Sequence, residues 1–401
     1  MHSAESERGS LRQRVRDVAL LFAKLGTTAF GGPAAHIAMM EAEVVRRRQW
    51  LTRDQFLDYL GATNLIPGPN STELAMHIGH ARAGWPGLVV AGVFFILPAA
   101  LIVGVAAWAY VQYGTLPAHA GLLYGAKPVV IAIVAQALWS LGRTAVKNTA
   151  LAMLGIVVAA AATAGVHELV VLAAAGAVMV VPGVAKRGLR TATRVVIVSA
   201  ASGATATAAG AAAATASFGL WPLFLVFAKA GAVLFGSGYA LLAFLRADFV
   251  QRLGWLTETQ LLDAIAIGQV TPGPVFTTAT FIGYLLGGAS GAAVATVGIF
   301  LPAFVFVAIS GPLVPWLRRS LVASAALDGI NVASLALMAV VSWQLGRAAL
   351  VDIVTIGLAL ASLIALVRFR INCAWLIAAG SALGWLVRTA VPPLTTGPGP
   401  P

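Results

Sequence analysis

Two Pro-Gly-Pro turns in apolar sequence carry the side chains best suited to bind a ligand. They are Pro67-Gly68-Pro69 and Pro272-Gly273-Pro274. A helix must break at each turn, because Pro cannot donate a backbone hydrogen bond and Gly permits a sharp bend. The polar side chains that follow the turns are Asn70, Ser71, Thr72, Thr277 and Thr278. These residue types favour helix N-termini, which bind anions, so we expect a cradle for an oxyanion built from Gly68, Gly273 and these side chains. A simple kink in a membrane helix is the alternative.

Two lysines lie in apolar segments at matching distances from the two turns, Lys24 and Lys229. An ionisable side chain at membrane depth is costly and marks a functional site by default. We expect these lysines to supply positive charge for a dianion. The alternative is that each side chain reaches to the membrane interface.

Further polar and flexible positions flank the turns. Phe30-Gly31-Gly32-Pro33 and Phe235-Gly236-Ser237-Gly238 read as a second pair of helix breaks, or as small residues that permit close helix packing. Asn64 and Gln269 precede the turns and are expected to line the pathway.

Three titratable residues occur in the first half alone: His36, Glu73 and His77. They are candidates for proton coupling, and a hydrogen-bonded buried polar group is the alternative for each. The six histidines have no metal-ligand spacing, and the single cysteine excludes a disulfide within the chain. We expect no metal, no cofactor and no enzymatic activity, because no catalytic triad or nucleotide-binding loop is evident.

The composition is that of a membrane protein. Of 401 residues, 59% are hydrophobic and 10% are charged, whereas about a quarter are charged in soluble domains. The net charge of +12 does not indicate nucleic acid, because Lys and Arg gather in short loops, as the positive-inside rule requires.

An internal repeat becomes visible when each residue is aligned with the one 205 positions later, or 204 positions later from Leu97-Pro98 onward. Lys24 then meets Lys229, Asp58 meets Asp263, and the two Pro-Gly-Pro turns coincide. We therefore expect an N-terminal cytoplasmic segment (1–16), a first repeat (17–183), a basic loop with a linker span (184–220), a second repeat (221–390) and a disordered tail (391–401).

Loop charges predict that the two repeats have opposite orientations. The loop at 46–53 holds four arginines, whereas its equivalent at 251–258 holds one arginine and one glutamate. Other loops show the reverse bias, which is typical of an inverted repeat. The predicted fold is thus an all-α polytopic membrane protein with two inverted homologous repeats, broken or re-entrant helices, and one extra transmembrane span that joins the repeats. Segments 17–40 and 56–80 are expected to be re-entrant, and thirteen crossing segments are the alternative.

Two stretches resemble the chromate ion transporter family, FGGPAAHI at 30–37 and LGATNLIPGPNSTE at 60–73, together with the loop that holds Trp50. The length resembles the long, two-domain members of that family. The resemblance implies efflux of chromate from the cytoplasm across the bacterial inner membrane, and chromate resistance. The second half departs from the pattern, with Val275 in place of Asn70 and Thr278 in place of Glu73, so equal anion binding by the two halves is left open.

The function predicted from these features is gradient-driven export of chromate, with proton exchange as in an antiporter. Sulfate or another oxyanion is a rival substrate of the same class. A membrane-embedded chromate reductase and a non-transporting scaffold are alternatives of other classes. The expected partners are the oxyanion and the lipid bilayer, and a homodimer is left open.

Overall fold

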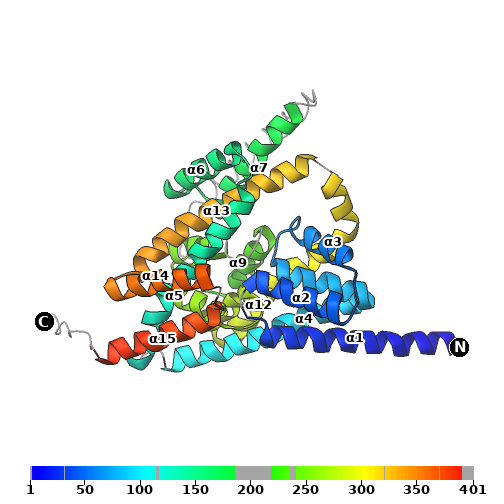
Figure 1. The fold of residues 1–401 in the computed structure, drawn as a ribbon, viewed down its shortest axis with the longest axis horizontal. Coiled ribbons are helices and arrows are strands. Elements are labelled where there is room, and N and C mark those ends of the chain that lie inside the picture. Colours follow the sequence, from blue (N-terminus) through cyan, green and yellow to red (C-terminus); the bar gives the residue numbers. More distant parts are fainter. Residues whose placement is uncertain are drawn as a thin grey trace, which may run out of the picture.

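The computed structural model describes residues 2–30, 32–113, 117–185, 218–234, 241–319, 321–369 and 371–390, and within these ranges every regular element is helical (Figure 1). The elements of the first half are α1 (His2–Thr28), α2 (Gly32–Glu41), η1 (Ala42–Arg47), α3 (Arg53–Thr63), α4 (Asn70–Tyr113), α5 (Pro117–Ala145), α6 (Thr149–Thr163) and α7 (Glu168–Ala185). Those of the second half are α9 (Leu220–Val233), α10 (Leu241–Leu245), η2 (Arg246–Arg252), α11 (Glu258–Val270), η3 (Val275–Thr277), α12 (Thr278–Arg319), α13 (Leu321–Ala349), α14 (Ile353–Phe369) and α15 (Cys373–Ala390). The linker span and the C-terminal tail that the sequence predicts lie mainly outside these ranges.

The helix breaks lie where the two prolines of each turn require them. α3 ends at Thr63 and α4 begins at Asn70, while α11 ends at Val270 and α12 begins at Thr278. The predicted breaks at both Pro-Gly-Pro turns are therefore confirmed. A third break, also predicted, separates α1 from α2 between Thr28 and Gly32.

The described helices include four that are long and apolar enough to cross a membrane. They span Asn70–Tyr113, Gly121–Ala145, Val275–Ser310 and Ser324–Ala349. Five shorter apolar helices accompany them: Thr149–Thr163, Glu168–Val180, Leu220–Val233, Ile353–Phe369 and Cys373–Thr389. The chain is therefore a multi-pass membrane protein, in which the number of full crossings stays a prediction.

The backbone repeats itself in detail between the two halves. α4 bends at Gly84 with φ 63° and ψ −151°, and α12 bends at Gly288 with φ 61° and ψ −151°. α3 and α11 both begin with a capping box, formed by Thr52 with Gln55 and by Thr257 with Gln260. In this motif the threonine hydroxyl accepts from the backbone of the third residue, whose side chain accepts from the threonine N–H. The same local sequence signals thus produce the same local structure twice.

The C-terminal helices of each half pack on the other half. α6 and α7 of the first half lie along α13, and α14 and α15 of the second half lie along α5 (Figure 1). Nearer the centre, α1 packs on α4, α9 packs on α12, and α4 packs on α12. Neither half is therefore a complete packing unit by itself.

Glycines make the contact between α5 and α15 possible. A methyl group on Gly384 would overlap the backbone of Gly125 and lie 2.6 Å from the carbonyl oxygen of Gly121. Small residues let membrane helices approach at backbone distance, which compensates for the absence of a hydrophobic driving force between helices in lipid.

We expect Gly384→Ala to lower the thermal stability of the protein, because the methyl group meets backbone atoms that cannot move aside. Overpacking of this kind costs about 1–3 kcal/mol. The measurement is the apparent melting temperature of the purified protein in detergent. Gly357→Ala on α14 is the matched control, since a methyl group there meets no atom within 4 Å. An unchanged melting temperature in Gly384→Ala would contradict the packing of α15 on α5.

A buried ion pair also joins the two halves. The Asp263 carboxylate on α11 is 2% exposed, accepts a hydrogen bond from the Tyr110 hydroxyl at 2.9 Å, and lies 3.0 Å from Lys127 Nζ on α5. Its equivalent in the first half, Asp58, is exposed. The repeat thus keeps an aspartate at both positions, but its surroundings differ between the halves.

We expect Lys127→Met to destabilise the protein by about 3–5 kcal/mol, because the variant leaves a buried carboxylate without its counter-charge. The double variant Lys127→Met/Asp263→Asn should recover most of that loss, as measured by thermal unfolding. Lys147→Met is the control, since Lys147 pairs with Asp328 at 2.7 Å with 58% of its side chain exposed, and such pairs contribute about 0–1 kcal/mol. Equal losses in the two lysine variants would refute the assignment.

Candidate functional site

The two Pro-Gly-Pro turns are bound reciprocally to the opposite halves. The amide of Gly68 donates to the carbonyl oxygen of Leu234 at 2.6 Å, and the amide of Gly273 donates to the carbonyl oxygen of Ala29 at 3.0 Å. Ala29 and Leu234 are equivalent in the repeat, and each directly follows the first apolar helix of its half. Each turn is therefore fixed to the opposite half by one hydrogen bond, whereas the anion cradle built from the two turns stays a prediction.

Only glycine fits at the centre of either turn. Gly68 has a φ of 139° and Gly273 a φ of 88°, which L side chains rarely adopt. A methyl group on Gly273 would also lie 2.7 Å from Cβ of Ala99, whose repeat equivalent, Ala303, faces Gly68 in the same way. The turns thus pack against the middle of the two long kinked helices.

The first backbone hydrogen bonds of α4 are accepted by the proline that precedes it. The amides of Thr72 and Glu73 donate to the carbonyl oxygen of Pro69 at 2.7 and 3.1 Å. The Asn70 side chain donates to Asn64 Oδ1 at 2.7 Å. α4 begins at Asn70, as the residue types after the turn predict. The structure brings Asn64 and Asn70 together, which the sequence did not show.

Among the hydroxyl groups at the turns, those of the second half are already used. Thr277 Oγ1 donates to the Pro274 carbonyl at 2.8 Å, and Thr278 Oγ1 donates to the Val275 carbonyl at 2.9 Å. In the first half, Ser71 and Thr72 are buried, and Thr72 Oγ1 has no hydrogen-bond partner among the described residues. Gln269, just before the second turn, is also buried.

Glu73 lies in the first turn of α4 and is completely buried, with an exposed fraction of 0%. Neither of its carboxyl oxygens has a hydrogen-bond partner among the described residues. A methyl group on Gly68 would overlap Glu73 Oε1, so the carboxyl group folds back onto the Pro-Gly-Pro turn. Thr278 occupies the equivalent position in the second half, which makes this feature asymmetric.

The two histidine candidates lie in different surroundings. His36 Nε2 is 3.0 Å from the Ala29 carbonyl oxygen, the same atom that accepts from Gly273, and its ring packs edge-on against Phe95. His77, one turn beyond Glu73, stacks on Tyr59 at 5.5 Å, and its Nε2 is 3.5 Å from Ser310 Oγ. His36 is thus at the anchor of the second turn, while His77 faces α3 and α12.

Lys24 and Lys229 form equivalent ion pairs that the sequence reasoning missed. Lys24 Nζ lies 3.0 Å from Glu43 Oε1, and Lys229 Nζ lies 2.5 Å from Asp248 Oδ2. Glu43 and Asp248 are themselves 205 positions apart, in the π-helical turns η1 and η2. Aligning the repeat through these acids would have found them. π-helical turns often occur at functional sites.

The two ion pairs differ in exposure and in their further partners. The Lys24 side chain is 55% exposed, and Glu43 also contacts Arg47 and Arg48. The Lys24 hydrogen bond, assisted by the arginines, holds the pKa of Glu43 below its ordinary value. The Lys229 side chain is 25% exposed and has a second acid, Glu168, at 3.7 Å.

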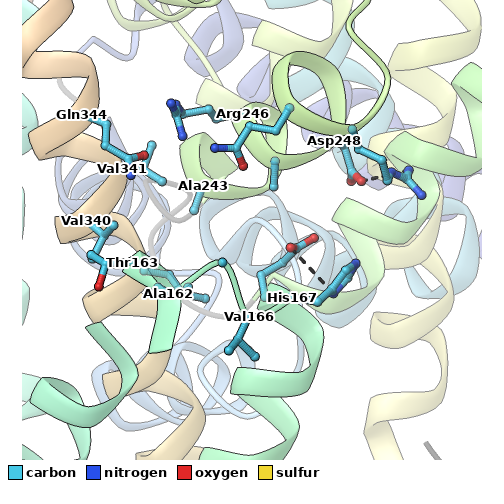
Figure 2. Close-up of a pocket in the computed structure, with 16 residues that line it drawn as sticks. Ala162, Thr163, Val166, His167, Ala243, Arg246, Asp248, Val340, Val341 and Gln344 are labelled. Atoms are coloured by element: carbon cyan, nitrogen blue, oxygen red, sulfur yellow. Dashed lines mark ion pairs between the residues drawn. The ribbon is translucent and has the colours of Figure 1, made fainter. Parts of the chain in front are cut away.

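The acids that pair with Lys229, Asp248 and Glu168, border a cavity of about 430 Å³ between α7, η2 and α13 (Figure 2). Arg246, Asp248, His167 and Gln344 extend toward it. The cations are engaged with acids: Arg252 pairs with Asp248 at 2.9 Å, and Arg246 pairs with Glu258 at 2.6 Å.

The remaining predicted positions are the glycines of the second pair of breaks. Gly32 begins α2 with a φ of 75°, as a break there requires. Gly31 and Gly236 lie outside the described residues. Among the described residues, no group of three metal-ligating side chains occurs.

Comparison with known proteins identifies the family of the chain. The chromate transporter family matches residues 16–181 and 221–385, that is, once in each half. The chain is 33% identical to the chromate transport protein of Cupriavidus metallidurans over 93% of each chain, and 33% identical to that of Pseudomonas aeruginosa over 91% of each. It is 32% identical to a probable chromate transport protein of Synechococcus elongatus over 86% of this chain and 87% of that one. No solved structure matches the chain.

A repeated helical fold with reciprocally bound turns thus coincides with a family match in both halves. The chain belongs to the chromate transporter family.

Proposed function

We propose that this protein exports chromate across the bacterial inner membrane, driven by an ion or voltage gradient, and thereby confers chromate resistance. The observation that carries the proposal is the reciprocal binding of the two Pro-Gly-Pro turns, Gly68 to Leu234 and Gly273 to Ala29. Inverted-repeat transporters place their substrate between broken helices at the repeat interface. Moving one half relative to the other must rearrange both turns at once, as alternating access requires.

The proposed substrate site lies around the N-terminus of α4, with Asn64, Asn70, Ser71 and Thr72 as its polar groups. Chromate is a tetrahedral dianion, which suits backbone N–H groups, hydroxyls and amides. The corresponding residues of the second half, Gln269, Thr277 and Thr278, complete the interface. The second-half threonine hydroxyls donate locally, which supports unequal roles for the two halves.

The direction of transport is supported by unequal charge around the two lysines. Three cations, Lys24, Arg47 and Arg48, surround the single carboxylate of Glu43. Around Lys229, two cations face two carboxylates, since Arg252 and Lys229 meet Asp248 and Glu168. With the basic loop at 46–53 on the cytoplasmic side, the net positive cluster around Lys24 attracts an anion from the cytoplasm. The cluster around Lys229 has no net charge, so an anion is released more easily on the opposite side.

Purified protein in proteoliposomes tests the proposal directly. Chromate flux is followed under imposed voltage and pH gradients, with sulfate as a competitor. Chromate flux that sulfate does not inhibit supports chromate as the substrate, whereas sulfate flux of equal or greater rate favours a general oxyanion transporter. Absence of flux under every gradient would refute transport. A parallel assay for loss of Cr(VI) tests the reductase alternative. The single thiol of the chain, that of Cys373, is buried.

We expect Asn70→Ala to lower chromate flux by about tenfold or more, because a hydrogen bond to a charged group contributes about 1.5–3 kcal/mol. The variant also removes the bond that orients Asn64. Flux is compared at equal reconstituted protein. Asn148→Ala is the control, since Asn148 caps α6 through a 2.9 Å bond to the Leu151 amide. Full flux in Asn70→Ala would remove this residue from the site.

A further inference from the structure

The completely buried carboxyl group of Glu73 occupies the place where an anion would bind. It lies in the first turn of α4 and folds back onto Gly68 at the helix N-terminus. Its two oxygens and Thr72 Oγ1 are buried polar atoms with no hydrogen-bond partner among the described residues. Buried polar atoms are ordinarily paired, so three unpaired ones at one helix end mark a site that another group completes.

Among the described residues, no cation forms an ion pair with Glu73. Among the residues whose side chains the structure describes, the elements that pack against α4 and α4 itself carry the following titratable and charged groups: Arg12, Arg14, Arg16, Asp17 and Lys24 (α1), His36 and Glu41 (α2), Arg53, Asp54, Asp58 and Tyr59 (α3), Glu258 and Asp263 (α11), Tyr284 (α12), and His77, His80, Arg82, Tyr110 and Tyr113 (α4). None of them forms a hydrogen bond or ion pair with Glu73. Two of them are engaged elsewhere, Lys24 with Glu43 and His77 with Tyr59 and Ser310.

An ionised Glu73 and a dianion cannot share this helix end. Both are negative, and both would use the same positive end of the α4 dipole in a site without a neighbouring cation. A protonated Glu73 favours anion binding, because a neutral carboxyl group can donate a hydrogen bond from its O–H to an oxyanion oxygen. Protonation therefore removes a repulsion and adds a hydrogen bond.

We propose that Glu73 is the proton-binding residue of the transport cycle, and that the oxyanion binds only when Glu73 carries its proton. The inference rests on the proposed function. Proton and dianion binding are then positively linked, so one proton and one dianion cross together with a net charge of −1. The proton therefore moves in the same direction as chromate, whereas in an antiporter the two move in opposite directions. Thr278, the equivalent residue of the second half, cannot carry a proton in this way, so the cycle has one such site.

The test compares the wild-type protein with Glu73→Gln in proteoliposomes. Chromate exchange without any gradient reports binding and translocation, and its dependence on chromate concentration gives the apparent affinity at each pH. The protonation of chromate itself is common to both proteins, so the ratio of their affinities isolates Glu73. In the wild type we expect the affinity to rise with acidity relative to the variant, by at most about tenfold per pH unit for one linked proton.

Two further measurements complete the test. An imposed proton gradient should drive chromate accumulation in the direction of proton flow for the wild type and not for Glu73→Gln. Wild-type protein in weakly buffered detergent solution should take up protons when chromate is added, which needs no variant. Asp54→Asn, which alters an exposed carboxylate on α3, should retain the wild-type behaviour.

The outcomes separate the inference from the proposed function. A wild-type protein that exchanges no chromate refutes both. Three results refute the proton-linked site alone, in a wild-type protein that exchanges chromate. They are a ratio of wild-type to Glu73→Gln affinity that does not change with pH, release of protons when chromate binds, and movement of chromate against the proton flow. A folded Glu73→Gln protein without exchange also refutes it, because a neutral glutamine should still admit the anion.

Discussion

The structure depends on two backbone hydrogen bonds that cross between its halves. Each is donated by the glycine of a Pro-Gly-Pro turn to the carbonyl group that ends the first apolar helix of the other half. The donors and acceptors are available because proline and the helix break leave backbone groups unpaired on both sides. In a membrane such groups must find partners within the protein. The repeat solves this requirement by letting each half satisfy the other.

The two halves also contact each other through their outer helices. The hairpin of α6 and α7 covers α13, and the hairpin of α14 and α15 covers α5. The interface between the halves therefore includes both the central turns and the outer helices, and it contains polar contacts such as Lys127 with Asp263 as well as glycine contacts. A relative movement of the two halves must preserve or exchange all of these together.

Much of this organisation could be predicted from the sequence. The composition indicated a polytopic helical protein, and the repeat located both broken turns and the equivalent lysines. Proline, glycine and capping-box signals are local, and the capping box forms in both halves. The sequence reasoning missed Glu43 and Asp248, because an acid among arginines resembles an ordinary loop charge until the fold places it beside a lysine. It also did not reveal the hydrogen bond between Asn70 and Asn64, because the geometry of the intervening turn decides whether these two side chains meet.

The exchanged hairpins have a consequence for biogenesis. α5 ends at residue 145, whereas its partners α14 and α15 begin at residues 353 and 373. During synthesis α5 therefore enters the membrane long before the helices that cover its glycine surface exist. Lipid must occupy that surface in the meantime and be displaced when α15 arrives. The packing of α5 is thus completed only after α15 has been synthesised.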